Sequence, residues 1–411
     1  MVYSEYNKTI LPNGLTIVSE KIPSVRSISI GVWVKSGTRN ENERCNGVAH
    51  FLEHMMFKGT EKRTALEIAR SLESVGGYLN AFTSKEQTCF YAEILDEHLP
   101  RAVEVLSDMV CHSVFDAEEF EKERQVILDE ISSVEDTPDE YIQDVFVEKL
   151  FPRNSLGFPI LGTRQSISQL TREQLLSFYR RHYAMENMVI AAAGSLEHQE
   201  LVELCERYFD LPEKGNSSDP EPVQEVGRGS LTFSRPVNQA HLCLGTSALP
   251  YDHPRKYELL LLNTMLGVGM GSRLFQNIRE KHGLAYAIYS FLDFYRYEGL
   301  LGIYLGTEKK KLEKARQLLK KELHKITVRP ISHRELEQLK SQVKGNFVLG
   351  LESTAKRMSR LAKMEIYLER FLDMDEVIEK IESVSRESLF ELSREMFEEK
   401  EFLEVTFLPG E

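Results

Sequence analysis

The feature that most constrains the fold of this 411-residue chain is that one order of expected elements occurs twice along it. Each half opens with an apolar strand, continues with two helices and a pair of strands, and then adds another helix. In the first half these elements are expected at 27–37, 47–57, 64–77, 78–95 and 99–110. In the second half they are expected at 239–249, 256–266, 272–283, 284–306 and 310–326. The recurrence predicts two homologous halves.

Blocks of strands alternate with blocks of helices, which differs from a strict alternation of single strands and helices. The pattern predicts an α+β fold of two homologous domains, each a mainly antiparallel sheet packed with helices. Each half then ends in a mostly helical tail. The tails are expected at 119–134 and 171–209, with a strand at 187–196, and at 333–367 and 375–397.

The segment Asp210–Ser230 is poor in apolar residues and rich in Pro, Gly, Ser and acidic residues, which is typical of a linker. With 411 residues, the chain is also longer than one hydrophobic core usually accommodates, so more than one domain is expected. We therefore expect an N-terminal domain at 1–212, a linker at 213–228 and a C-terminal domain at 229–411.

The composition excludes several classes of protein. The chain has 51 Lys and Arg against 64 Asp and Glu, a formal charge of −13, which argues against a nucleic-acid partner. Its five cysteines are widely spaced without a CxxC pair, so neither a disulfide framework nor a cysteine zinc site is expected. The opening MVYSEYNKTI lacks the pattern of a signal peptide, and no apolar run has the length of a membrane span. We expect a cytoplasmic protein.

The segment GVAHFLEHMMF, Gly47–Phe57, holds two histidines and a glutamate in a mostly apolar stretch. On a helix His50 and His54 lie about 40° apart and Glu53 about 60° to the other side of His50, so all three share one face. Two imidazoles one turn apart can hold one zinc ion, and a carboxylate between them can take a proton from water at the metal. This is the H-x-x-E-H order of inverzincins. A lone histidine on an apolar face is usually a core residue, but the whole constellation favours a metal site.

Catalytic zinc keeps three protein ligands and one open position, so the motif predicts a third ligand elsewhere. The best candidate segment is the helix that Asp116 is expected to cap. Its inward stripe consists of Phe120, Ile127 and Ile131. Glu123 and Glu130 lie two turns apart on one flank of that stripe. Carboxylates at such an edge are costly unless they are paired or bind a metal, so both are candidate site residues.

The segments GVAHFLEHMMFKGT, GGYLNAFTSKEQTCFYAEIL and ERQVILDEISSVEDTPDE resemble the pitrilysin and mitochondrial processing peptidase superfamily, in its bacterial processing-protease-like branch. The likeness covers nearly the whole chain, including FYRRHYAMENMVIAAAGSL and GSRLFQNIREKHGLAYAIYS. It implies the mitochondrial processing peptidase-like metallohydrolase fold. It also implies a zinc endopeptidase that cleaves unfolded peptides or presequence-like segments within an enclosed chamber.

Position by position, the resemblance implies that His50, His54 and Glu130 ligate zinc, with one ion per chain. Glu53 would be the general base. Glu123 would orient a histidine ligand without touching the metal.

The resemblance also implies substrate contacts in both halves. Arg279 and Tyr286 of REKHGLAY would contact the substrate or the developing oxyanion, although from the sequence alone they read as a helix-end arginine and a core tyrosine. The strand YLNAFTS resembles the family strand whose free edge pairs with an extended substrate, although it also fits an ordinary core strand. The residues expected to bind peptide backbone are Asn80, Ala81, Phe82 and Thr83.

The chain departs from the family pattern in RNSLGFPILGT, where Asn154 and Ser155 stand at a place that often holds a histidine. The second half has LLLLNTML where the first has HFLEH, so it cannot build a second zinc site and would supply the facing wall of the chamber. The glycine-rich GVGMGS lies between two expected helices and lacks a P-loop lysine, so it is interpreted as a turn and not as a phosphate loop.

Family members enclose the substrate between two lobes of two domains each, and this chain has the length of one lobe. Because it carries both the zinc motif and the Arg/Tyr pair, we expect a homodimer. One alternative is a non-catalytic peptide-binding or scaffold subunit of a two-chain processing protease, which should have lost metal ligands. Another is a small-molecule lyase such as S-ribosylhomocysteine lyase, which shares the zinc helix but is far shorter and uses a catalytic cysteine.

Overall fold

The computed structural model describes residues 5–215, 219–399 and 401–410. The chain forms two compact units, and each is described here by itself. Unit 1 consists of Met1–Ser132, Phe158–Pro220 and Gly350–Phe371. Unit 2 consists of Ser133–Gly157, Glu221–Leu349 and Leu372–Glu411.

Unit 1 contains a six-stranded sheet in the order β1-β2-β6-β3-β5-β4, so that β1 and β4 form its edges. Its strands are β1 (Glu5–Ile10), β2 (Thr16–Lys21), β3 (Ser27–Val34), β4 (Tyr78–Thr83), β5 (Thr88–Leu95) and β6 (Met188–Gly194). Neighbouring strands are antiparallel except for β2 and β6, which run parallel.

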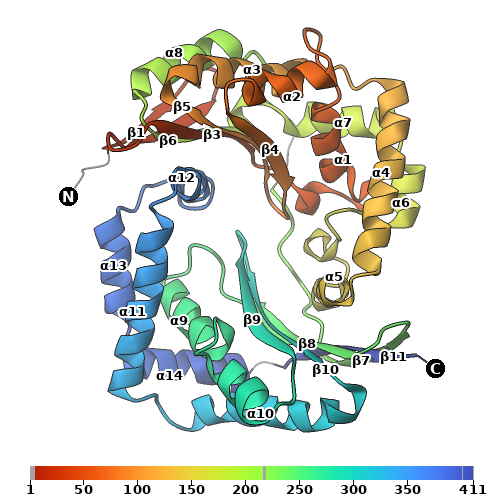
Figure 1. Cartoon of the computed structure of the whole chain (residues 1–411), viewed down its shortest axis with the longest axis vertical. Helices are drawn as coiled ribbons and strands as arrows, with labels where there is room; N and C mark the ends of the chain where they lie inside the picture. The colour runs from red at the N-terminus through yellow and green to blue at the C-terminus, as the bar shows by residue number, and fades with distance from the viewer. Residues whose placement is uncertain (1–4, 216–218, 400, 411) are drawn as a thin grey trace. The chain divides into compact units, whose positions relative to one another are not determined.

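Helices of unit 1 lie on both faces of this sheet and beside it. They are α1 (Val48–Met56), α2 (Ala65–Glu73), α3 (Leu99–His112), α4 (Ala117–Glu135), α6 (Arg164–Gln169), α7 (Arg172–His182), α8 (His198–Tyr208) and α12 (Thr354–Leu368). In Figure 1, α3 and α8 lie on one face of the sheet and α12 lies on the other, where it contacts β2, β3 and β6.

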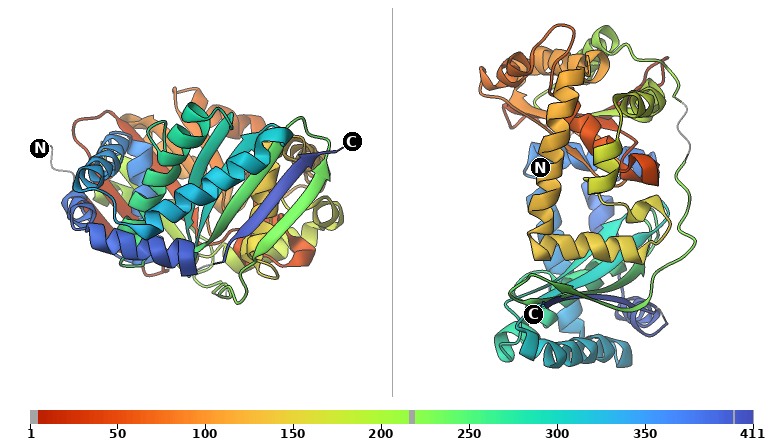
Figure 2. Two further views of the ribbon diagram at one scale, coloured as in Figure 1. Left: turned by 90° about the horizontal axis from the view of Figure 1, so that it is seen from below. Right: turned by 90° about the vertical axis from the view of Figure 1, so that its right-hand side faces the viewer.

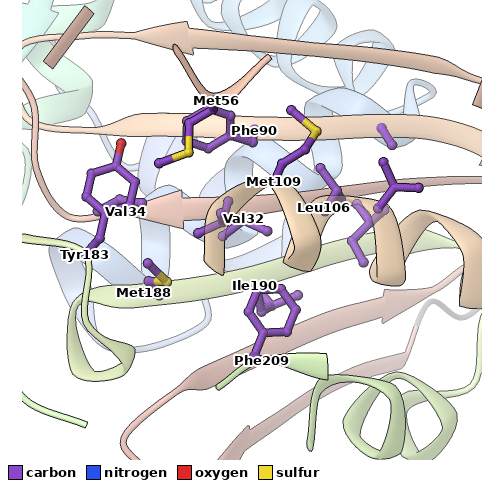
Figure 3. Close-up of a cluster of buried hydrophobic side chains, with 14 of the residues drawn as sticks. Val32, Val34, Met56, Phe90, Leu106, Met109, Tyr183, Met188, Ile190 and Phe209 are labelled. Atoms are coloured by element: carbon purple, nitrogen blue, oxygen red, sulfur yellow. The ribbon is translucent and has the colours of Figure 1, made fainter. Parts of the chain in front are cut away.

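The main core of unit 1 fills the space between the sheet and the helices on its α3 side. Figure 3 shows Val32 and Ile190 of the sheet beside Leu106 and Met109 of α3. Because α12 covers the opposite face, β3 is buried on both sides. Alternate residues, among them Ile28 and Val32, belong to the main core, and the hydroxyl of Ser29 lies 2.8 Å from that of Thr354 in α12. The burial of apolar side chains is the largest favourable contribution to folding.

Unit 2 contains a five-stranded sheet in the order β7-β11-β8-β10-β9, antiparallel except for β7 and β11. Its strands are β7 (Gly229–Arg235), β8 (Ala240–Ala248), β9 (Ala287–Phe294), β10 (Gly299–Thr307) and β11 (Leu403–Pro409). Its helices are α5 (Pro138–Leu150), α9 (Lys256–Gly267), α10 (Leu312–Val328), α11 (His333–Gly350), α13 (Met374–Glu382) and α14 (Arg386–Arg394). Helix α5 packs on β8 and β11, while α9, α10 and α14 lie on the other face of the sheet (Figures 1 and 2).

The predicted fold class is confirmed, because both sheets are mainly antiparallel and packed with helices. Four strands, β1, β2, β7 and β11, have no counterpart among the predicted elements. The edge strands β1 and β7 expose many of their residues, which leaves little hydrophobic alternation to detect. The helix expected at 272–283 is π-helical over Phe275–Lys281. Within the described ranges, no helix has both the length and the apolar character that a membrane crossing requires.

The two units differ from the predicted domains, 1–212 and 229–411, because one segment of each predicted domain packs in the other unit. Residues 133–157 belong to unit 2, and residues 350–371 with α12 belong to unit 1. The predicted tail at 333–367 is therefore broken, and Ser353 caps α12 as a new helix. Part of the predicted linker, residues 216–218, lies outside the described residues. Its later part packs in unit 2, where the Asn154 side chain donates to the carbonyl of Glu221 at 3.3 Å.

His182, at the end of α7, is a buried histidine of unit 1 with 4% of its surface exposed. Its ring packs against Phe178 with centroids 4.4 Å apart. Burial and, to a smaller extent, the charge of Arg181 lower the pKa of His182 from 6.5 to about 4. The imidazole is therefore neutral in the folded protein at pH values where it would be protonated in the unfolded chain.

We expect this histidine to make unit 1 less stable in acid. Because its pKa is lower in the folded state, its contribution is complete above pH 6.5 and is lost as the pH falls toward 4. Between pH 8 and pH 5 the free energy of unfolding should fall by about 2 kcal/mol more in the wild type than in His182→Leu. Urea unfolding at both pH values measures this, with His98→Leu as the control for loss of an imidazole. An equal pH dependence in wild type and His182→Leu would contradict the prediction.

Candidate metal centre

Helix α1 carries the H-x-x-E-H residues on its polar face. The buried residues of this nine-residue helix are Val48, Ala49, Phe51, Leu52, Met55 and Met56. They pack into the core of unit 1, and α1 contacts α7 and β4. Because these apolar positions occupy one side of the helix, His50, Glu53 and His54 emerge together on the other.

Helix α4 lies beside α1 in unit 1 (Figure 1). Its start is capped as predicted, since Oδ1 of Asp116 accepts hydrogen bonds from the backbone N–H groups of Glu118 and Glu119 at 2.9 and 3.1 Å. Phe120 stacks on Phe51 of α1 with ring centroids 4.5 Å apart. This contact fixes the rotation of α4 and turns its acidic flank toward the histidines.

The two histidines and Glu130 form a possible metal site. One donor atom from each of His50, His54 and Glu130 lies within 4.8 Å of the others. The Nε2 atoms of His50 and His54 lie 3.9 and 3.7 Å from Oε2 of Glu130. Tetrahedral zinc with bonds of 2.0–2.1 Å separates its donors by about 3.3 Å, so small movements of side chains suffice to complete the site. Among the described residues, this is the only such group of three.

The hydrogen bonding of these residues also fits a metal ion. Oε2 of Glu130 is buried and accepts no hydrogen bond from any described residue. Burial and, to a smaller extent, the charge of His54 lower the pKa of His50 to about 3, so the ring is neutral, as a metal ligand must be. A buried carboxylate oxygen without a donor is costly unless a cation compensates it.

Glu123 and Lys58 hold His54 in place. Oε2 of Glu123 lies 2.9 Å from Nδ1 of His54, and its Oε1 lies 2.6 Å from the ammonium of Lys58. Burial acts to raise the pKa of Glu123, but its hydrogen bonds to His54 and Lys58 outweigh burial and lower it. Burial acts to lower the pKa of His54, but the hydrogen bond to Glu123 and the charges of Glu130, Glu123 and Glu53 outweigh burial and raise it. With Nδ1 hydrogen-bonded to Glu123, Nε2 is the ring nitrogen that would exchange its proton for a metal ion.

Glu53 lies between the histidines and the edge strand β4. The hydroxyl of Thr83 donates to Oε2 of Glu53 at 2.5 Å. Burial raises the pKa of Glu53, while the hydrogen bond from Thr83 and the charge of His54 oppose the rise. A carboxylate with a raised pKa is a stronger proton acceptor near neutral pH.

The strand that contains Asn80–Thr83 is observed as β4, at the edge of the sheet next to β5, and its role in substrate binding stays a prediction. Asn80 and Phe82 are exposed, whereas Ala81 and Thr83 are half-buried. The side-chain oxygen of Asn80 accepts the N–H of Ala81 at 2.8 Å, so an incoming peptide would have to displace this hydrogen bond. Because β4 pairs only with β5 in this sheet, its other edge can accept another strand.

Arg279 and Tyr286 lie in unit 2, near the start of β9. The guanidinium of Arg279 is 4.8 Å from the ring centroid of Phe275, and 53% of the surface of Tyr286 is exposed. Unit 1 therefore brings together the three candidate ligands with Glu53, Glu123 and Thr83 at the end of β4.

Two roles of nearby residues are not predicted from the sequence. Lys58 follows His54 by four residues, one helical turn, and this spacing could have suggested its contact with Glu123. Thr83 is expected only as a substrate-binding residue, yet its hydroxyl bonds Glu53. No spacing rule connects Thr83 with Glu53, because a long-range contact between β4 and α1 creates the pair.

Replacing Lys58 by Met removes the ammonium group and keeps most of the aliphatic stem. Glu123 then loses one of the two groups that hold its charge beside His54. We expect the zinc affinity, measured by competition with a chelator, to fall about tenfold. Lys62→Met removes an exposed lysine from the same segment and is the control. Unchanged affinity in Lys58→Met would refute the role of this lysine.

Comparison with known proteins identifies relatives along almost the whole chain. Residues 16–164 match the family model of insulinase, peptidase family M16, and residues 169–343 match that of the peptidase M16 inactive domain. The chain is 41% identical over 387 residues to a protein of Bacillus subtilis named uncharacterized zinc protease YmxG, covering 94% of each chain. It is 37% identical over 409 residues to another uncharacterized zinc protease, from Streptomyces coelicolor, covering 97% of this chain and 88% of that one.

Solved structures share the fold. A protease from Helicobacter pylori has a TM-score of 0.89 at 22% identity, covering 99% of this chain and 100% of that chain. A peptidase M16 inactive domain from Pseudomonas fluorescens has a TM-score of 0.91 at 19% identity, covering 99% of both chains. The resemblance to the pitrilysin superfamily and its fold is therefore confirmed. The chain belongs to the insulinase family, peptidase family M16.

Proposed function

We propose that the protein is a zinc endopeptidase that cleaves unfolded peptides. The observation that carries the proposal is the convergence of His50, His54 and Glu130 on one point in unit 1, with Glu53 beside them. The zinc protease names of the relatives from Bacillus subtilis and Streptomyces coelicolor support the same activity.

In this proposal His50, His54 and Glu130 hold one zinc ion per chain. Zinc in such a site supplies Lewis-acid chemistry, which polarises a carbonyl and makes water nucleophilic at neutral pH. Glu53 takes the proton of the attacking water and returns it to the leaving amine. Its raised pKa and its hydrogen bond from Thr83 support this role, since the first strengthens the base and the second fixes one of its oxygens.

We further propose that substrate binds as an extended strand along Asn80–Thr83. The support is that β4 is an edge strand and that its last residue is hydrogen-bonded to Glu53, so a peptide added there would run toward the proposed base. For Arg279 and Tyr286 the proposal rests on the family resemblance. Their hydrogen-bond donors suit contacts to a substrate carbonyl or an oxyanion.

The proposed assembly is a homodimer in which each copy contributes one lobe to an enclosed chamber. A chamber of this kind would select unfolded peptides, because folded proteins would not enter it. We place the protein in the cytoplasm, and the five unpaired thiols support a reducing compartment.

The second candidate function is a non-catalytic peptide-binding or scaffold subunit. The match of residues 169–343 to an inactive domain favours it. That match contains none of the residues of the candidate metal centre, however, and the first half brings both histidines and Glu130 together. The peptidase is therefore the better supported of the two functions.

Glu53→Gln preserves the shape of the side chain but cannot accept a proton. We expect this variant to bind zinc like the wild type and to cleave peptides at least about 100-fold more slowly. A mixed library of short unstructured peptides, read by mass spectrometry, measures the cuts. Glu73→Gln, at an exposed position of α2, is the matched control and should cleave normally.

Two outcomes of this experiment would count against the proposal. Cleavage by Glu53→Gln at the native rate would exclude Glu53 as the base. A metal-loaded wild type that makes no cuts would favour the subunit function. As a contrast, His50→Ala should lose bound zinc as well as activity, and full retention of zinc would refute the ligand assignment.

The homodimer predicts a mass near twice the 47.3 kDa of the chain. Light scattering of the active, metal-loaded protein at micromolar concentration measures this mass. A monomer in the active preparation would refute the proposed dimer and leave the metal chemistry unaffected.

A further inference from the structure

Helix α1 begins without a capping side chain of its own. Its N-cap is Gly47, with a φ of 91° and no side chain to accept a hydrogen bond. The first N–H groups of any helix lack a carbonyl acceptor within the helix. Here they also lack easy access to water, because Gly47, Val48 and Ala49 are buried. Another group must satisfy these donors.

Glu41, six residues before Gly47, supplies the missing acceptors. Its Oε2 accepts the N–H of Gly47 at 2.8 Å, and its Oε1 accepts the N–H of Ala49 at 2.8 Å. The side-chain amide of Asn46 donates to Oε2, also at 2.8 Å. Only 7% of the surface of Glu41 is exposed, so an acidic group is buried at the positive end of the α1 dipole.

The segment that joins Glu41 to α1 is itself fixed. The side chain of Asn46 donates to the carbonyl of Pro159 at 3.0 Å, and the hydroxyl of Ser166 donates to the carbonyl of Asn46 at 2.7 Å. A Cβ at Gly47 would lie 2.7 Å from the carbonyl oxygen of Leu161. Position 47 also has a positive φ, so it requires glycine. Because glycine has no side chain, this position cannot cap the helix.

Only a carboxylate meets all three donors at once. A glutamine at position 41 would offer one acceptor oxygen and would turn its own amide protons toward the other N–H groups. Burial raises the pKa of Glu41, and the hydrogen bonds from Ala49, Asn46 and Gly47, which stabilise the ionised form, offset only part of that rise.

We propose that Glu41 is a positioning residue for the metal centre, which fixes the first turn of α1 and thereby the orientation of His50. The residue whose N–H it holds, Ala49, directly precedes His50. The inference rests on the part of the proposed function that assigns His50, His54 and Glu130 to the metal. It does not depend on peptidase activity.

Glu41→Gln tests this role. We expect about tenfold weaker zinc binding, by chelator competition, and a changed visible absorption spectrum of the cobalt-substituted protein, which reports ligand geometry. Glu20→Gln is the matched control, because Glu20 is a buried acid of unit 1 that pairs with Arg357 of α12. It should retain the wild-type zinc affinity and cobalt spectrum. Wild-type affinity and spectrum in Glu41→Gln would overturn the inference.

A measurement on the wild type keeps the test valid if Glu41→Gln does not fold. In amide hydrogen exchange of the whole chain, the N–H groups of Gly47 and Ala49 should be protected to the same degree as amides inside α1. Rapid exchange of these two amides, with the rest of α1 protected, would show that Glu41 does not hold them. A wild type that binds metal but cleaves no peptide would count against the proposed function alone.

Discussion

The burial of one face of α1 is the constraint on which the candidate metal centre depends. Side chains such as Phe51, Leu52 and Met55 each contribute roughly 1.5–3 kcal/mol when they leave water, so a rotation of the helix that exposed them would be costly. An isolated helix of nine residues is not stable, and α1 therefore takes its position from packing. Its polar residues are thereby directed to the side where α4 and β4 lie. The stacking of Phe51 on Phe120 extends the same constraint to α4 and its two glutamates.

Two glutamates of this centre have the same chemistry and opposite surroundings. Glu53 is partly buried and has one hydroxyl donor, and burial raises its pKa. Glu123 is more deeply buried, but an imidazole and an ammonium stabilise its charge, and its pKa is lowered. Such a separation of pKa values assigns different roles to chemically equal groups. Glu53 suits proton transfer, and Glu123 suits a fixed charge that orients His54.

The sequence predicts the local parts of this arrangement well. The H-x-x-E-H spacing and the inward stripe of α4 are both local patterns. They point to His50, His54 and the two candidates Glu123 and Glu130, and the structure brings Glu130 close to both histidines. The position of α12 in unit 1 is not predictable in this way, because the sheet that it covers ends at Gly194 and α12 begins only at Thr354. The hydrogen bonds from the start of α1 to Glu41 are not predictable either. Glu41 lies in a loop before the helix, so no helical spacing indicates that its carboxylate reaches these N–H groups. Long-range packing decides these features, and neither propensity nor periodicity reports it.

X-ray absorption at the zinc edge tests the central claim, that α1 and α4 together form one zinc site. For the zinc-loaded protein the account predicts two imidazole nitrogens and oxygen donors at about 2.0–2.1 Å, with no sulfur. A shell that contains sulfur, or one of oxygen atoms without imidazole, would contradict it, because the metal would then be bound by residues other than His50, His54 and Glu130.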